Sequence, residues 1–419
     1  MSDRTTAEAI EAVWRLESTR LIAGLVRMVR DVGLAEDLAQ DAMVAALAQW
    51  PTAGIPDNPG AWLMTTAKRR AVDTFRRRER GDRAYRSVAQ EVTDEVTEDS
   101  ILAALDHVED DVLRLMFVCC HPSLTAEAQT SLTLRLVAGL TTREIARAYL
   151  TTESTVAQRL VRAKRTLTQA GAALEEPTVA ARGERLDAVL GVIYLLFNEG
   201  YAATAGPDWA RPSLCAEALR VGRILVALMP RHGEARGLLA LMELQSSRLT
   251  ARVGPDGEPV LLADQDRTRW DAGHLARGLR ILSHAESLVD APGPYTLQAA
   301  IAGCHARAAS TAETDWVQIA GLYHRLARQT GSAVVEVNRA VALGMAYGPE
   351  AGLQLADQLV DLPALRDYHL LPSVRGDLLA RLGRRAEARA EFIRAAELTS
   401  NERESRLLLE RARRLAEGP

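Results

Sequence analysis

The chain has 419 residues, enough for two or three domains with substantial cores. Aromatic residues are only 4% of it and alternating Val, Ile and Thr runs are rare, so we expect an all-α protein. The net charge is −4, four cysteines are too few for a disulfide framework, and no apolar run has membrane-span or signal-peptide length. These features exclude disulfide-rich secreted and membrane proteins and predict a cytoplasmic location.

The N-terminal 50 residues carry apolar positions at helical spacing, including Val13, Leu16, Leu21 and Leu25. The segment Trp50 to Gly60 holds three prolines and predicts an ordered loop. A long basic helix is then expected over residues 61–80. Beyond it, the stretch from 91 to 111 contains acidic residues and no Lys or Arg, so we expect residues 81–100 to form a flexible acidic linker.

Residues 139–167, GLTTREIARAYLTTESTVAQRLVRAKRTL, predict a helix, a tight turn and a second, basic helix. Thr141 and Glu144 form a capping box for the first helix, and Thr151 or Thr152 can cap the second. One face of the second helix is apolar, at Val156, Leu160, Ala163 and Leu167, while the opposite face carries Arg and Gln. Such a helix suits the DNA major groove, although an ordinary amphipathic pair with a solvated basic face has the same pattern.

The chain from 173 to 419 is rich in Ala and Leu. Near its end, Gly376, Ala388, Phe392 and Ala395 follow the small and large register of a tetratricopeptide repeat, which predicts an irregular helical array; an ordinary helical bundle is the alternative. The segment VGPDGEPVLLADQDRTRWD interrupts the array and suggests a hairpin. Polar residues also recur in these helices, and they predict either a packing network or a ligand or peptide groove. They are Asn198, Glu199, Tyr201, Arg267, Trp270, Asp271, Tyr295, Gln298, His305, Asn338 and Arg339.

Catalytic signatures are missing from the sequence. The only two lysines, Lys68 and Lys164, each follow Ala, so neither lies in a Walker-A loop, and no G-x-G-x-x-G, H-E-x-x-H or G-x-S-x-G motif is present. Adjacent Cys119 and Cys120 with His121 cannot easily hold one metal ion, and we interpret them as buried core residues. We therefore expect no enzyme activity, no cofactor and no metal.

Two blocks of the chain resemble a bacterial RNA polymerase sigma factor of the extracytoplasmic-function type. GLAEDLAQDAMVAALAQW with NPGAWLMTTAKRRAVDTFRRR is similar to sigma region 2, and residues 139–167 are similar to region 4. The resemblance implies four parts: region 2 over 1–80, a linker over 81–100, region 4 over 101–172, and over 173–419 the tetratricopeptide-like extension of one subgroup. In that subgroup the extension is thought to control the sigma domains in cis, through an intramolecular contact.

The resemblance also implies partners and site residues. Core RNA polymerase would be bound through its β′ clamp coiled coil and β flap, with Asp37, Gln40 and Asp41 facing the clamp. The −10 element would be trapped and melted by Asn58, Trp62, Lys68, Arg69, Arg70, Arg76 and Arg77. The −35 element would be contacted by Ser154, Thr155, Ala157, Gln158, Arg159, Val161, Arg162 and Arg165.

Several of these assignments have alternatives. Asp37 and Asp41 could form a solvated acidic face, and Trp62 could pack in the core. Two departures from the family, Leu150 at the turn and Ala157 on the recognition helix, put the −35 sequence in doubt. For the whole chain, a LuxR-like DNA-binding activator with a tetratricopeptide sensor or a helical interaction scaffold are the competing hypotheses.

Overall fold

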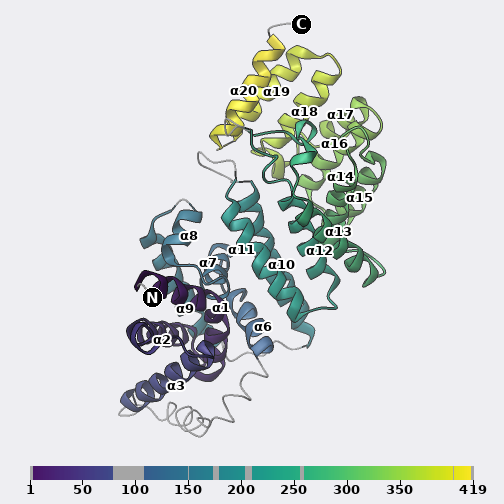
Figure 1. Cartoon of the computed structure of the whole chain (residues 1–419). Helices are drawn as coiled ribbons and strands as arrows, with labels where there is room; N and C mark the ends of the chain where they lie inside the picture. Colours follow the sequence, from purple (N-terminus) through teal and green to yellow (C-terminus); the bar gives the residue numbers. More distant parts are fainter. Residues whose placement is uncertain are drawn as a thin grey trace. The chain divides into compact units, whose positions relative to one another are not determined.

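The computed structural model describes residues 3–78, 108–149, 151–172, 179–202, 210–254, 259–399 and 401–416 (Figure 1). The chain divides into two compact units, residues 1–195 and 196–419. In the described part of the chain every regular element is a helix, and one isolated β-bridge joins Val253 to Pro259. The all-α class predicted from composition is confirmed. The expected linker at 81–100 and Leu150 at the turn lie outside the described residues.

Three helices open the first unit: α1 (Asp3–Val29), α2 (Val32–Ala53) and α3 (Pro59–Arg78). The break between α1 and α2 falls at Arg30, whose φ is +55°, and at Asp31, whose carboxylate accepts a hydrogen bond from the Leu34 N–H at 2.7 Å and so caps α2. Contrary to the expected loop from Trp50, α2 continues through Pro51, which lies in its last turn. The loop is therefore confined to residues 54–58.

The second group of helices in this unit is α6 (Val108–Cys119), α7 (Ala126–Leu132) with the π-helical turn η1 (Thr133–Val137), α8 (Thr142–Ala148) and α9 (Glu153–Ala170). After η1 the chain reverses at Gly139, which has φ +69°. A Cβ there would lie 3.2 Å from Ser18 Oγ on α1, so glycine suits both the backbone conformation and the close approach.

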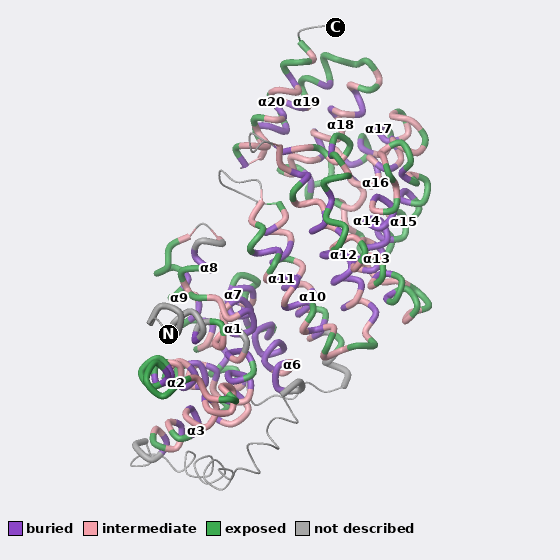
Figure 2. The backbone as a smooth tube through the Cα atoms, in the orientation of Figure 1, coloured by how far each residue is buried: buried purple, intermediate pink, exposed green. Residues whose placement is uncertain are grey.

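The core of this unit contains residues from both groups of helices. Trp50, Leu63 and Phe75 from α2 and α3 are buried, and α6 is largely buried as well (Figure 2). Cys119 and Cys120 are at most 1% exposed, and burial raises the pKa of the Cys120 thiol to about 12. The prediction that these cysteines are core residues is confirmed.

The second unit consists of helices that pack mainly against their neighbours in sequence (Figure 1). Its boundary falls within α10 (Val179–Tyr201). The following helices are α11 (Pro212–Leu228), α12 (Gly233–Ser246), η2 (Leu262–Asp264), η3 (Arg267–Arg269), α13 (Ala272–Ser287), α14 (Pro294–Arg307), α15 (Trp316–Thr330), α16 (Ala333–Ala346), α17 (Pro349–Gln358), η4 (Pro363–Leu365), α18 (Leu370–Arg381), α19 (Arg385–Leu398) and α20 (Glu402–Ala416).

Local cores along the second unit favour an array over a single bundle. One core joins Leu297 to Ile319, another joins Val337 to Leu379, and a third contains Phe392 and Leu408. These cores lie between successive helices, as in proteins built from stacked helix pairs. The C-terminal extension is helical, as the sequence predicted.

The repeat register near the C-terminus matches the packing of α18 against α19. A Cβ on Gly376 would lie 2.9 Å from the Phe392 ring, so the missing side chain makes room for the aromatic one. The hairpin expected between α12 and α13 is not formed by the described residues: a single bridge between Val253 and Pro259 is followed by the short turns η2 and η3. A strand needs two or more ladder pairs, and the chain after Val260 enters the turn η2 and does not continue the pairing.

Candidate nucleic-acid interface

The pair α8 and α9 has the caps that its sequence predicts. Thr141 N–H donates to Glu144 Oε2 at 2.8 Å and Glu144 N–H donates to Thr141 Oγ1 at 3.2 Å, which completes the capping box. Thr152 Oγ1 accepts from the Thr155 N–H at 3.1 Å, and Gly171 ends α9 in the left-handed conformation. Both caps satisfy backbone groups at the helix ends, so α9 begins and ends at defined residues.

One face of α9 is buried and the other is free. The predicted apolar stripe of Val156, Leu160, Ala163 and Leu167 is at most 6% exposed. Val161 is 62% exposed, which is unusual for an apolar side chain on a helix otherwise anchored in a core. It lies among exposed residues of the predicted −35 set, namely Ser154, Thr155, Ala157, Gln158, Arg162 and Arg165.

The arginines of α9 differ in their contacts. Arg159 is partly buried, and its Nη1 is 3.4 Å from Ser131 Oγ on α7. Within the described part of the chain, Arg162 and Arg165 are exposed and make no ion pair. Their guanidinium groups can therefore take a new acceptor, such as a base edge or a phosphate, without breaking an existing bond.

Helix α3 places the predicted −10 residues on one element. Asn58 Oδ1 caps α3 by accepting from the Ala61 N–H at 3.0 Å, and the residue itself is exposed. Trp62 is partly exposed and contacts buried Trp50 edge-on, with ring centroids 5.2 Å apart. Of the basic residues, Arg69 is exposed, while the side chains of Arg76 and Arg77 lie outside the described residues.

Two other basic residues of α3 are already engaged. Lys68 is only 6% exposed, so little of its side chain is open to a phosphate. Arg70 Nη1 lies 3.3 Å from Asp41 Oδ2, in an exposed ion pair between α3 and α2. An exposed pair of this kind is weak and can exchange for a stronger anion.

The predicted polymerase-facing residues Asp37, Gln40 and Asp41 lie on α2. Asp37 and Asp41 are exposed and Gln40 is partly buried. Partial burial raises the pKa of Asp37, with Lys164 opposing and the acids at 36, 41 and 31 adding to the rise. Two exposed carboxylates one turn apart on α2 would attract a cationic partner.

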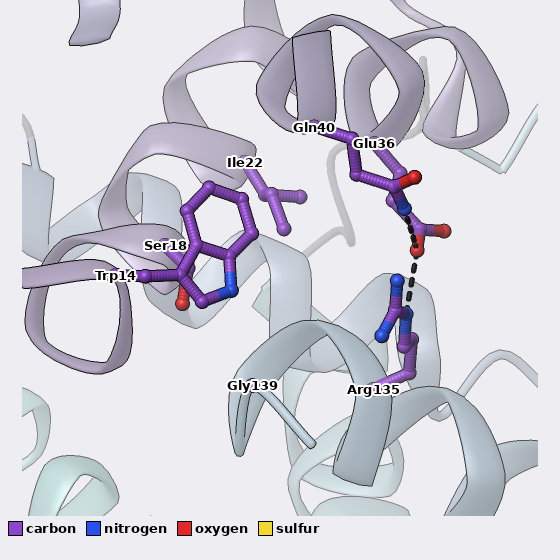
Figure 3. A pocket seen from close by; sticks show the side chains of 7 residues that line it. All are labelled: Trp14, Ser18, Ile22, Glu36, Gln40, Arg135 and Gly139. Carbon is purple, nitrogen blue, oxygen red and sulfur yellow. Dashed lines mark hydrogen bonds and ion pairs between the residues drawn. The ribbon is translucent and has the colours of Figure 1, made fainter. Parts of the chain in front are cut away.

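Sequence reasoning missed the residue beside them, Glu36. It is 4% exposed, and three side chains donate to its carboxylate: Arg135 Nε at 2.6 Å, Gln40 Nε2 at 2.9 Å and Lys164 Nζ at 3.0 Å. Figure 3 shows Glu36 between Gln40 and Arg135, beside a cavity of about 10 Å³, roughly the room of one water molecule. Burial alone would raise the pKa of Glu36, but Arg135 and Lys164 outweigh it and hold the pKa below its ordinary value.

The Glu36 contacts are part of a larger interface between the first three helices and the helix-turn-helix group. Thr168 Oγ1 donates to Asp31 Oδ2 at 3.0 Å, and Thr19 Oγ1 donates to the Val137 carbonyl at 2.8 Å. The sequence does indicate a buried acid here, because Glu36 lies among Ala35, Leu38 and Ala39 at a helical position that faces the core.

In the second unit the structure brings part of the predicted polar set together. Arg267 Nη1 donates to the His305 carbonyl at 2.6 Å, and its guanidinium lies 5.1 Å from the Trp270 ring centroid. Burial lowers the pKa of His305 to about 4, with Arg248 and Arg267 adding to the effect. Arg267 also donates to Ala308 O at 2.6 Å, so it closes the carboxyl end of α14.

Other members of that set make contacts close to their own helices. Glu199 pairs with Arg211, Arg339 Nη1 lies 2.7 Å from Glu336 Oε2, and Asp271 caps α13. Tyr201 lies under Arg252, while Tyr295 and Gln298 bond near the start of α14 through backbone groups. Asn198 and Asn338 are partly buried. Arg267 thus meets two members of the predicted set, Trp270 and His305, and for the other members the expectation that they bond to one another stays a prediction.

A second missed residue, Glu243, anchors this unit. It is 1% exposed on α12, and its carboxylate meets Arg223 at 2.7 Å, His274 at 2.7 Å and Arg277 at 3.2 Å. Burial opposes ionisation, but the hydrogen bonds from Arg223 and His274 hold the pKa of Glu243 below its usual value. The sequence indicates its burial, because Glu243 lies within the apolar run LLALMEL.

The described residues contain no group of three or more His, Cys, Asp or Glu side chains that could hold a metal ion. Nor do they include a helix with the length and apolar character needed to cross a bilayer.

A capped helix-turn-helix with exposed Arg and Gln side chains, in a unit that also carries the basic helix α3, is typical of DNA-binding transcription factors. The sigma-70 region 2 family matches residues 14–81, the sigma-70 region 4 family matches 114–167, and a family of unknown function, DUF6596, matches 185–286. The chain is 31% identical over 149 residues to the ECF RNA polymerase sigma factor SigK of Mycobacterium ulcerans, which covers 34% of this chain and 74% of that protein. It is 42% identical over 386 residues to an uncharacterized protein of Rhizobium meliloti, covering 92% of this chain and 90% of the relative.

The chain belongs to the ECF RNA polymerase sigma factors, and it carries a C-terminal helical extension. Sigma factors are transcription initiation factors and not enzymes, which agrees with the expectation from the sequence.

Proposed function

We propose that this sigma factor docks on core RNA polymerase through α2, reads the −35 element with α9 and opens the −10 element with α3. One observation carries the proposal: α9 is anchored by a buried stripe while its opposite face, with Val161 62% exposed, is free. An element held this way can enter the major groove without unfolding its own domain. The proposed parts are residues 1–80, 81–100, 101–172 and 173–419, acting in the cytoplasm.

On α9, Gln158 and Arg162 are the proposed base readers, because Gln can bond adenine and Arg guanine in bidentate fashion. Val161 and Ala157 would contact thymine methyl groups. Ser154, Thr155 and Arg165 would hold the phosphate backbone and set the register. Arg159 would join them after releasing its weak bond to Ser131.

On α3, the exposed end of Trp62 would stack on an unpaired base, and the amide of Asn58 would meet a base edge while its oxygen caps the helix. Arg69, Arg70, Arg76 and Arg77 would hold phosphates. Lys68 is left out of this set, because its side chain is buried.

On α2, Asp37, Gln40 and Asp41 would face the β′ clamp coiled coil, while region 4 would meet the β flap. The acidic side chains of α2 would attract a basic partner and speed its encounter. Core polymerase is therefore the first partner, and promoter DNA the second.

The direct test is multi-round transcription by purified core polymerase on a broad promoter set, with and without the full chain. We expect promoter-dependent transcripts that Arg162→Ala reduces and that an exposed change outside the proposed surfaces, Arg325→Ala on α15, leaves unchanged. If the chain bound duplex promoter DNA tightly without polymerase and gave no transcripts with it, a LuxR-like activator would replace the sigma proposal.

We further propose that the C-terminal extension controls the sigma domains in cis. Its support is the array of local cores, a type of fold that presents extended surfaces for protein contacts. A chain ending near residue 175 should give a strongly changed transcript level with the same polymerase and promoter. Equal transcript levels at equal protein concentration would reject control in cis.

A further inference from the structure

A cationic cluster in the second unit is formed by Arg248, Arg267, Trp270 and His305. Arg248 follows the end of α12, Arg267 and Trp270 belong to η3 and its C-cap, and His305 lies in the last turn of α14, which packs against α12. The guanidinium carbons of Arg248 and Arg267 lie 5.4 and 5.1 Å from the centroid of the Trp270 ring. Two guanidinium groups are therefore held around one indole.

The two arginines of the cationic cluster bond to neutral groups. Arg248 donates from Nε to Gln265 Oε1 at 3.2 Å and from Nη1 to Gln245 Oε1 at 3.2 Å. Arg267 donates from Nη1 to two backbone carbonyls at the end of α14, each at 2.6 Å, and from Nη2 to Thr314 Oγ1 at 3.1 Å. Neither arginine forms an ion pair within the described part of the chain. A guanidinium has five N–H donors, so each of them keeps donors for a further acceptor.

The positive charges of the cluster repel one another. Burial lowers the pKa of Arg248, and the charges of Arg252 and Arg267 add to this effect while Tyr201 opposes it. Burial lowers the pKa of Arg267 as well, against the opposing charge of Glu313. Cations that are partly removed from water and lie close together cost free energy, and an anion placed among them would reduce that cost.

Polar atoms that lack a hydrogen bond belong to the same cluster. Trp270 and His305 are 7% and 8% exposed, and neither Trp270 Nε1 nor His305 Nδ1 bonds to a group among the described residues. The hydroxyl of Tyr201, whose ring centroid lies 3.6 Å from the guanidinium carbon of Arg252, is buried in the same way. Buried polar atoms are usually satisfied, and an indole N–H can only donate. A ligand of this cluster should therefore offer acceptor oxygens.

The cluster is fixed in place by backbone bonds. The Asp271 N–H donates to the Ser247 carbonyl at 2.8 Å, and Arg269 Nη2 donates to the Thr250 carbonyl at 2.6 Å, so η3 is tied to the end of α12. Because the donors are already placed, little ordering would be needed when an anion binds. The side chains of Arg248 and Arg267 are also partly exposed, which leaves them accessible from solvent.

We propose that Arg248, Arg267 and Trp270 form a binding site for the oxyanion group of a small molecule, either a carboxylate or a phosphate. The arginines would donate to its oxygens, as guanidinium groups do to both kinds of anion, and the Trp270 N–H would supply a further donor. The negative charge would offset the repulsion within the cluster. This inference goes beyond control of the sigma domains by the extension, and it does not depend on polymerase or promoter binding.

Isothermal titration calorimetry of the full chain tests the site at constant ionic strength. The probes are citrate, which carries carboxylates, and inorganic phosphate and pyrophosphate. We expect at least one of them to bind with one molecule per chain, and tighter binding of citrate or of pyrophosphate identifies the preferred oxyanion. A parent chain that binds none of the three at millimolar concentration would overturn the proposal.

Charge variants locate the bound probe. Arg248→Gln and Arg267→Gln should each weaken binding at least about tenfold, because each removes charge-assisted hydrogen bonds. The matched control is Arg325→Gln, an exposed residue of α15 that loses the same charge and should bind like the parent. Equal affinities of the parent and both cluster variants, at matching circular dichroism, would place the anion elsewhere and refute the site.

Fluorine NMR of the full chain labelled with 5-fluorotryptophan gives a readout that needs no charge change. The Trp270 signal is assigned by its absence from the Trp270→Phe variant. It should shift as the probe is added, with the midpoint that calorimetry gives. If an arginine variant fails to fold, this measurement decides alone: a Trp270 signal that stays unmoved at saturating probe would rule out the proposed site.

Discussion

Trp62 meets Trp50 edge-on, with the two ring centroids 5.2 Å apart and the ring planes at 64°. Trp50 is 2% exposed and fixed in the core, whereas Trp62 keeps part of its ring at the surface. The buried ring therefore sets the orientation of the exposed one. Both alternatives considered for Trp62 are compatible with this arrangement, because one edge packs and the rest can still stack.

Trp62→Ala should impair promoter opening more than polymerase binding. Loss of a stacking surface removes about 1–3 kcal/mol per base, and loss of the edge contact removes about 0.5–1.5 kcal/mol of stability. Permanganate footprinting of the −10 region measures opening, and anisotropy measures binding to polymerase. Trp62→Phe should retain part of the opening; equal footprints for the Ala variant and the parent would exclude a stacking role.

Arg162 and Arg165 should give different DNA phenotypes, although both are exposed cations of α9. Arg162→Ala removes a base reader, so discrimination at one promoter position should fall by about 1–3 kcal/mol. Arg165→Ala removes a phosphate contact, so the affinity should fall for all promoters alike. The slope of the logarithm of the binding constant against the logarithm of the salt concentration should decrease in magnitude by about one. Holoenzyme binding across a single-substitution promoter library at several salt concentrations separates the two effects, and identical profiles would contradict the assignment.

Glu36→Gln should destabilise the first unit by about 1–3 kcal/mol at pH 7, because it leaves two partly buried cations without their carboxylate. The folded pKa of Glu36 is lowered, so its stabilisation is present above the ordinary pKa near 4.5 and is lost as the pH falls through the folded value. Urea unfolding followed by tryptophan fluorescence should thus show a gap between parent and variant that narrows below pH 4.5. A gap that stays constant down to pH 3 would argue against the ion pairs as its source.

His305 should make the second unit sensitive to mild acid. Its folded pKa is about 4 against an ordinary 6.5, so the unfolded chain binds the proton more strongly. The stabilisation is complete above pH 6.5 and is lost as the pH falls toward 4, by at most about 3 kcal/mol. Calorimetry of the parent and of His305→Gln between pH 7 and pH 4.5 measures the difference, and an imidazole NMR titration with a midpoint near 6.5 would refute it.

Gly376→Val should destabilise the α18 and α19 pair, because its Cβ would fall 2.9 Å from the Phe392 ring. Overpacking of this kind costs about 1–3 kcal/mol. The double variant with Phe392→Leu should recover part of the loss by removing the ring. Thermal unfolding of the parent, the two single variants and the double variant gives the coupling energy between the two positions. Strictly additive changes in the free energy of unfolding would mean that the two residues are not in contact.

Much of the fold could be predicted from the sequence, because capping boxes and apolar stripes are local signals. The Thr141–Glu144 box and the buried stripe at Val156, Leu160, Ala163 and Leu167 are confirmed. The course of α2 through Pro51 was missed, because a proline removes a backbone donor and usually marks the end of a helix. Here the last turn is closed by the Gly54 N–H, which donates to the Trp50 carbonyl at 2.9 Å.

The contacts of the candidate site were harder to foresee. Glu36 meets Arg135 and Lys164 across 99 and 128 residues of sequence, and no local pattern encodes such a pairing. The same holds for Glu243, whose three partners come from two other helices. An acidic residue in an apolar helix indicates a buried carboxylate, but its partners can be identified only from the packed structure.

The local cores of the extension carry a consequence for its folding. Each helix pair is stabilised mainly by its immediate neighbours. If one pair unfolds, such as α18 with α19, distant pairs should therefore remain folded. The backbone amides of residues 210–416 would then exchange hydrogen in several contiguous groups, and each group would have its own free energy of opening. A sigma factor with such a tail could shed or re-form part of it while the rest keeps its shape.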